Sequence, residues 1–91
     1  SSFSASAAST LTKVGFDIGI VVSNDKSDYR ITTRAKKQVC LRTGLHLGKI
    51  ISEINNVDGG GHDGAATLNG KDDAEEILNQ LIGKIKETLI K

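Results

Sequence analysis

The stretch of this sequence most suited to chemistry is Gly59-Gly60-Gly61-His62. Glycines leave the backbone bare, and consecutive unhindered N–H groups form a concave site that binds anions. The imidazole that follows adds a side-chain donor at the same place. The combination is typical of phosphate binding, and it predicts an irregular loop here. A plain flexible connection is the alternative, although such loops more often carry Asn, Asp, Ser or Lys.

The second candidate is Arg34, at the end of a predicted strand. Its planar guanidinium carries a fork of donors that matches a phosphate group. Residues 26–49 contain seven basic residues and one acidic residue, whereas residues 50–91 contain eight acidic and four basic residues. A basic face is therefore expected around Arg34, with Arg30, Lys36 and Lys37 as candidate contacts to a phosphate backbone. An ordinary solvated surface is the alternative for these charges.

Other kinds of site are less well supported. Cys40, His46 and His62 lack the spacing of zinc ligands, and Cys40 is better explained as a small apolar residue. The glycines at 59, 61 and 64 fit a dinucleotide-binding pattern, but that motif must follow a strand and open a helix. Here a predicted helix precedes the glycines. We expect no catalytic residue, no metal ligand and no bound cofactor in this chain.

Strands and helices must position these residues. Apolar residues alternate over residues 16–22, and a second strand spans residues 29–34. The polar residues 23–28 between them predict a turn and thus an antiparallel hairpin. Residues 35–42 fit a short helix that ends at Gly44, and a second helix starts at Leu47 and continues to about Asn55 or Asn56. A short strand over residues 65–68 and a turn at Asn69-Gly70 follow.

A long C-terminal helix is the clearest element. Asp72 is its predicted N-cap, with Glu75 as the capping-box partner. Gly83 lies inside this helix, where close packing against a neighbouring element would explain it. The apolar stripe that predicts the helix consists of Ala74, Ile77, Leu78, Leu81, Ile82, Ile85 and Leu89.

Length and composition limit the function further. The chain has 91 residues, enough for one domain, and a net charge of +1, which excludes a strongly basic nucleic-acid binder. Its three aromatic residues are too few for base stacking along a strand. No signal peptide or membrane span is recognisable, and the single cysteine favours a cytoplasmic protein. We expect residues 1–14 to be a Ser/Ala-rich linker or short helix. Residues 15–91 should form an α/β domain in which helices pack on a small mixed sheet.

The order of these motifs resembles a known family. An arginine on a strand, the segment from Gly44 to Lys49, and Gly-Gly-Gly-His followed two residues later by Ala65-Ala66 are similar to the DHH-associated C-terminal domain of RecJ-like phosphoesterases. The segment at 44–49 and Asp63 look most like the archaeal-type branch. The resemblance runs from Phe16 to the C-terminus. Thr67 stands where the family usually has glycine.

The resemblance implies a lobe that binds nucleic acid in an exonuclease or related hydrolase of the DHH phosphoesterase class. Arg34, Gly59, Gly60, Gly61 and His62 would hold phosphates of single-stranded DNA or RNA. The N-terminal DHH lobe of the same parent chain would carry manganese or magnesium ions and perform the hydrolysis. The lobe alone would not be catalytic, and a role in DNA repair or replication, with proteins of those processes as partners, would fit.

Two alternatives remain open at this stage. The same lobe occurs in phosphodiesterases of short oligoribonucleotides or cyclic dinucleotides, to which the residues above apply equally. A degenerate protein-interaction module is the other alternative, and Thr67 and the modest net charge favour it.

Overall fold

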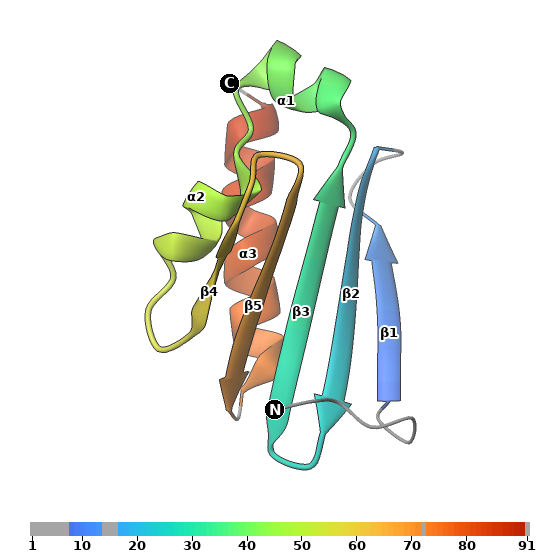
Figure 1. Cartoon of the computed structure of the whole chain (residues 1–91), viewed down its shortest axis with the longest axis vertical. Coiled ribbons are helices and arrows are strands. Elements are labelled where there is room, and N and C mark those ends of the chain that lie inside the picture. The colour runs from blue at the N-terminus through green and yellow to red at the C-terminus, as the bar shows by residue number, and fades with distance from the viewer. Residues whose placement is uncertain (1–7, 14–16, 72, 91) are drawn as a thin grey trace.

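The computed structural model describes residues 8–13, 17–71 and 73–90. These residues form five strands and three helices (Figure 1). In chain order the elements are β1 (Ala8–Lys13), β2 (Ile18–Asp25), β3 (Asp28–Ala35), α1 (Lys37–Thr43), α2 (Leu47–Ser52), β4 (Asp58–Gly61), β5 (Ala65–Lys71) and α3 (Ala74–Leu89).

The strands form one sheet in the order β1-β2-β3-β5-β4, and each described pairing is antiparallel. The β2–β3 hairpin closes through Lys26 and Ser27, because Asp25 pairs with Asp28. β3 then pairs with β5 instead of β4, so that Arg34 lies opposite Ala65. The two segments predicted to bind phosphate are therefore separated by a single strand.

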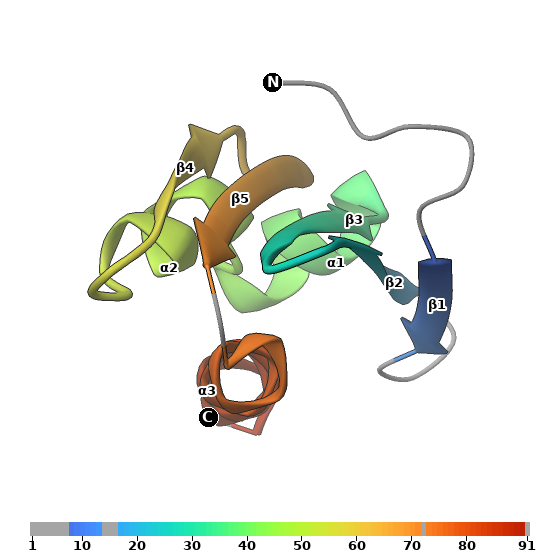
Figure 2. The ribbon, with the colours of Figure 1, turned by 90° about the horizontal axis from the view of Figure 1, so that it is seen from below.

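One face of the sheet carries the core. Alternation along β2 and β3 buries Ile18, Ile20, Val22, Tyr29 and Ile31 on the same side, as period-two patterning requires. From α3, Ile77, Leu81 and Ile85 pack into this core, and from α2, Leu47, Ile50 and Ile51 do so. Figure 2 shows α3 lying against this face of the sheet.

The opposite face of the sheet, which we call the open face, carries the residues that alternate with the core. These include Arg30, Thr32 and Arg34 on β3 and Thr67, Asn69 and Lys71 on β5, all exposed or partly exposed. No described helix lies across the middle of this face (Figure 2). The open face is thus the surface on which a ligand can lie along the strands.

Several predictions are confirmed. The α/β class, the 29–34 strand, the antiparallel hairpin and the long C-terminal helix are all present. Gly44 ends α1 in the left-handed conformation at φ 78°, where its N–H donates to the Cys40 carbonyl. No helix in the described ranges is long and apolar enough to cross a membrane.

The prediction of a linker or short helix at the N-terminus is wrong for Ala8–Lys13, which forms edge strand β1 beside β2. Its Ser, Thr and Ala residues lack the apolar alternation that identifies a strand, so the pairing partner determines the conformation. The remaining residues of the 1–14 segment lie outside the described ranges, as does Phe16. The sheet is also uniformly antiparallel in its described pairings, where a mixed sheet was expected.

Three predictions in the second half of the chain are also wrong. The glycine run is strand β4 instead of an irregular loop, and Asn69-Gly70 continues β5 instead of turning the chain. The Tyr29 ring packs where a side chain at position 70 would lie, which explains the glycine there. Gly83 is exposed, and a Cβ there would meet nothing within 4 Å, so close packing inside the described chain does not explain it.

Two helix boundaries differ from those predicted. α2 ends at Ser52, three to four residues earlier than its apolar spacing indicated, because a turn follows in which Asn56 adopts a φ of 69°. The N-cap of α3 is Asp73, whose side chain makes no capping hydrogen bond. The predicted cap, Asp72, lies outside the described residues.

Candidate nucleic-acid interface

The glycine motif forms a tight β-hairpin. β4 and β5 pair from Asp58↔Asn69 to Gly61↔Ala66, and the His62 N–H continues the ladder by donating to the Ala65 carbonyl at 2.7 Å. Only Asp63 and Gly64 remain as the turn. Asp-Gly between two strands is a strong hairpin signal in sequence, and it was the signal that sequence reasoning overlooked.

The turn is hydrogen-bonded to the N-terminal end of α2. The N–H of Leu47 donates to the Asp63 carbonyl and the N–H of Gly48 donates to the His62 carbonyl, both at 2.9 Å. His46 caps the same helix, since its Nδ1 accepts from the Lys49 N–H at 3.0 Å. His62 therefore has its backbone fixed on both sides while its side chain stays exposed.

Close backbone approach explains most glycines around this hairpin. A Cβ on Gly48 would collide with the backbone of Gly61, and a Cβ on Gly59 or Gly61 would collide with the backbone of β5. Gly61 also has a φ of 151°, which other residues rarely adopt. These three glycines are required by the fold itself.

Gly60 is different, because a Cβ there would meet nothing within 4 Å and its φ is not positive. It pairs with Thr67, whose position in the alternation of β5 is on the open face. Neither packing nor backbone conformation in the described chain explains a glycine at this position. A glycine on an open surface is what close approach of a ligand to the backbone would require.

The expected nest of consecutive free amides is not present, and the reason is strand pairing. In an antiparallel ladder, alternate residues direct their N–H groups toward the partner strand. The His62 N–H is bonded to Ala65, and the Gly64 N–H is bonded to Oδ1 of Asp63 at 2.8 Å. The glycines thus provide bare strand surface instead of an amide cup.

Arg34 and His62 come together in one cross-strand row. Arg34 pairs with Ala65 on β5, and Ala65 accepts the hydrogen bond from His62. Two interstrand spacings separate the Cα atoms of Arg34 and His62 by about 10 Å. The buried Thr33 fixes this register, because its Oγ1 donates to the Ala66 carbonyl at 2.8 Å. Both side chains are exposed, with only the small Ala65 between them.

The other predicted basic contacts divide into two groups. Lys36 and Lys37 are exposed at the same end of β3 as Arg34, although Lys36 forms an ion pair with Asp17 at 3.4 Å. Arg30 lies four residues back along β3, and its Nε donates to Oδ1 of Asn69 at 3.1 Å. At the Arg34 end of the sheet the three basic side chains of Arg34, Lys36 and Lys37 outnumber the two carboxylates of Asp17 and Asp63, so a net positive charge remains there.

Cys40 lies beneath the turn. Its Sγ donates to the Asp63 carbonyl at 3.4 Å, and burial, followed by the nearby Asp63 charge, raises the pKa of this thiol. A raised pKa disfavours the thiolate, so the residue fits a structural role better than a nucleophilic one. This agrees with its interpretation as a small apolar residue.

The described residues do not fit a metal centre. Nowhere in the described ranges do three His, Cys, Asp or Glu side chains gather closely enough to hold an ion. The arrangement is suited to binding an anion. The exposed side chains of Arg34, Lys36, Lys37 and His62 lie at one end of the sheet, and the small residues of β4 leave the neighbouring backbone accessible.

Comparison of the sequence with models of protein families shows the family to which the chain belongs. A model of the DHHA1 domain matches residues 4–91, nearly the whole chain. The chain belongs to the DHHA1 domain family. No curated protein and no solved structure matches the chain.

Membership of the DHHA1 family relates this chain to enzymes with two domains. DHHA1 domains are C-terminal domains of DHH-family phosphoesterases and accompany an N-terminal DHH catalytic domain in the same chain.

Proposed function

We propose that this DHHA1 domain is the substrate-binding lobe of a RecJ-like, single-strand-specific exonuclease, in which Arg34 and His62 hold phosphates of the strand. The observation that carries the proposal is the row Arg34–Ala65–His62, in which a guanidinium-bearing and an imidazole-bearing residue have Cα atoms about 10 Å apart, with both side chains exposed among the described residues. Gly60 lets the sugar–phosphate backbone approach β4, and Lys36 and Lys37 add long-range attraction.

In this proposal the hydrolysis, with the manganese or magnesium ions it needs, belongs to the N-terminal DHH domain. The DHHA1 domain orients the strand relative to the catalytic domain. Arg34 donates two parallel hydrogen bonds to one phosphate, and the fixed backbone of His62 aims a further donor at the same strand. With few aromatic side chains, the domain recognises the backbone more than the stacked bases.

Fluorescence anisotropy with a labelled oligothymidylate of about ten nucleotides tests the proposal directly. We expect Arg34→Ala to weaken binding by about 10- to 100-fold, the worth of a charge-assisted hydrogen bond, and His62→Ala by about five-fold or more. Arg42→Ala on α1 removes the same charge elsewhere and should change affinity by less than about two-fold. Equal losses for Arg34→Ala and Arg42→Ala would mean that only net charge matters, and the proposed site would be wrong.

The Gly60→Ala variant distinguishes an effect on ligand binding from an effect on folding stability. The new methyl group meets nothing in the described chain, so thermal stability should change by no more than about 0.5 kcal/mol. Binding of the oligonucleotide should nevertheless weaken. Unchanged affinity in a fully stable Gly60→Ala variant would show that the strand does not approach β4.

A further inference from the structure

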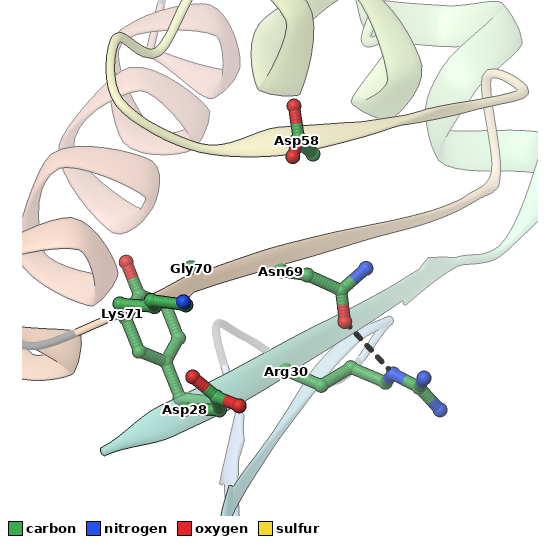
Figure 3. A pocket seen from close by; sticks show the side chains of 7 residues that line it. Asp28, Arg30, Asp58, Asn69, Gly70 and Lys71 are labelled. Carbon is green, nitrogen blue, oxygen red and sulfur yellow. Dashed lines mark hydrogen bonds between the residues drawn. The ribbon is translucent and has the colours of Figure 1, made fainter. Parts of the chain in front are cut away.

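A hollow of about 340 Å³ lies at the other end of the sheet, and we call it the Asn69 hollow (Figure 3). It opens where β3 and β4 begin and β5 ends. Its volume is within the range of small-molecule sites. The alternation along the strands puts Arg30 and Asn69 on the open face, the face that also carries Arg34. The lining residues are Asp28, Tyr29, Arg30, Asp58, Asn69, Gly70 and Lys71.

Hydrogen bonding fixes the central side chain of this hollow. Oδ1 of Asn69 accepts from Nε of Arg30 at 3.1 Å, so the amide nitrogen of Asn69 points the other way, as Figure 3 shows. The amide N–H group of the exposed Asn69 is thus oriented by the hydrogen bond with Arg30 and can donate to a ligand. The carboxylates of Asp28 and Asp58 supply acceptors nearby.

The charges of the Asn69 hollow limit its ligand. Asp28 and Asp58 balance Arg30 and Lys71, so the site is neutral overall. A phosphate would meet two carboxylates, and a cation would meet a guanidinium and an ammonium group. A neutral group that both donates and accepts hydrogen bonds fits best. In a nucleic-acid strand these groups are the base edge and the ribose hydroxyl.

Position links this hollow to the phosphate site. Arg30 and Arg34 lie on the same face of β3 four residues apart, which is about 14 Å along the strand. About four nucleotides at a stacked spacing of about 3.4 Å cover this distance. We infer that the Asn69 hollow binds an uncharged nucleoside part of the same strand whose phosphates Arg34 and His62 hold. The inference rests on the proposed function and specifies its substrate as a strand longer than a dinucleotide.

A length series tests the inference with the 91-residue chain. Binding of a dinucleotide and of oligomers of about four to eight nucleotides is measured for the wild type and for Asn69→Ala. We expect Asn69→Ala to weaken binding of the longer oligomers by about five-fold, the worth of one neutral hydrogen bond, and to leave dinucleotide binding unchanged. Asn79→Ala, an exposed asparagine on α3, is the matched control and should match the wild type at every length.

Asn69→Asp provides a second variant that keeps the shape of the side chain but replaces its amide donor by a carboxylate oxygen. It should also weaken only the longer oligomers, which separates a binding effect from a folding defect in Asn69→Ala. An unchanged length dependence in both variants would overturn the inference. If the wild type itself gains nothing from added length, the inference is also wrong, and a dinucleotide-specific phosphodiesterase lobe becomes the better description.

The outcomes distinguish the inference from the proposed function. If Arg34→Ala weakens all lengths while Asn69→Ala weakens none, the phosphate site stands and the Asn69 hollow does not bind the strand. If no oligonucleotide binds at all, the proposed function itself fails. Comparing oligouridylate with oligodeoxyuridylate isolates the ribose hydroxyl, and a single guanosine within each tests whether a base edge occupies the hollow.

Discussion

The two ends of the open face are built from the same strands but differ in charge. At the hairpin end, Arg34, Lys36 and Lys37 gather with His62, and Asp17 is paired to Lys36. At the opposite end, Arg30 and Lys71 are balanced by Asp28 and Asp58. The first end keeps a net positive charge even when Asp63 in the turn is counted, whereas the second carries oriented donors and acceptors with no net charge. A chain with a net charge of +1 can therefore still carry one end of net positive charge and one neutral end on the same face.

The ends also differ in how firmly they are held. The hairpin turn is bonded to α2 through Leu47 and Gly48, whereas the Asn69 hollow is lined by strand residues of which Asp58, Asn69 and Lys71 are exposed. A substitution that disturbs α2 should therefore damage the hairpin end first.

The largest effect is expected for Gly48→Ala. The added Cβ would collide with the backbone of Gly61, which a side-chain rotation cannot relieve, so the variant should lose about 1–3 kcal/mol of stability. Urea unfolding measures this loss. Gly83→Ala on α3 is the control, because its methyl group has open space and a helical alanine should stabilise the domain by up to about 1 kcal/mol. Equal stability of the two variants would mean that α2 and β4 do not pack closely.

A smaller effect concerns salt. Each phosphate contact that is lost should lower the salt dependence of single-strand binding by about 0.7 in log–log slope. We expect this change for Arg34→Ala and no change for Asn69→Ala, since the Asn69 hollow carries no net charge. Anisotropy titrations over a range of salt concentrations give both slopes. A reduced slope for Asn69→Ala would show that the two ends do not differ as described.

The smallest effect is expected from the Cys40 thiol. Because burial raises its pKa in the folded domain, the unfolded chain loses this proton first as the pH rises. The stability that Cys40 contributes is therefore complete below about pH 8.5, the usual thiol value, and declines above it. Urea unfolding of the wild type and Cys40→Ala at neutral and alkaline pH isolates this component. A steeper alkaline decline in Cys40→Ala than in the wild type would contradict the assignment.

How far the sequence predicted the fold depended on side-chain patterning. The alternation of Ile18, Ile20 and Val22 identified β2, and the apolar stripe identified α3. β4 was missed because its three glycines have no side chains to form a pattern. It exists because β5 offers a ladder on one side and the start of α2 is hydrogen-bonded to the two residues that follow β4.

The candidate site was predictable in its residues but not in its arrangement. Motif chemistry selected Arg34 and His62, and their role in binding remains a prediction. Their placement in one row depends on β3 pairing with β5, which no local pattern reveals. The Asn69 hollow was missed for the same reason, since Asp28, Asp58 and Asn69 come from three strands that are adjacent only in the folded domain.

The tether between α2 and the turn has a consequence for motion. The N–H groups of Leu47 and Gly48 are hydrogen-bonded to the carbonyls of Asp63 and His62, and the Leu47 side chain is buried in the core. These contacts restrain the tip of the hairpin, so it cannot close over a ligand without breaking them. Any clamping onto a strand must then be a swing of the whole domain about its connection to a neighbour. The His62 backbone would already be ordered, so that only the conformational entropy of its side chain would be lost at the moment of capture.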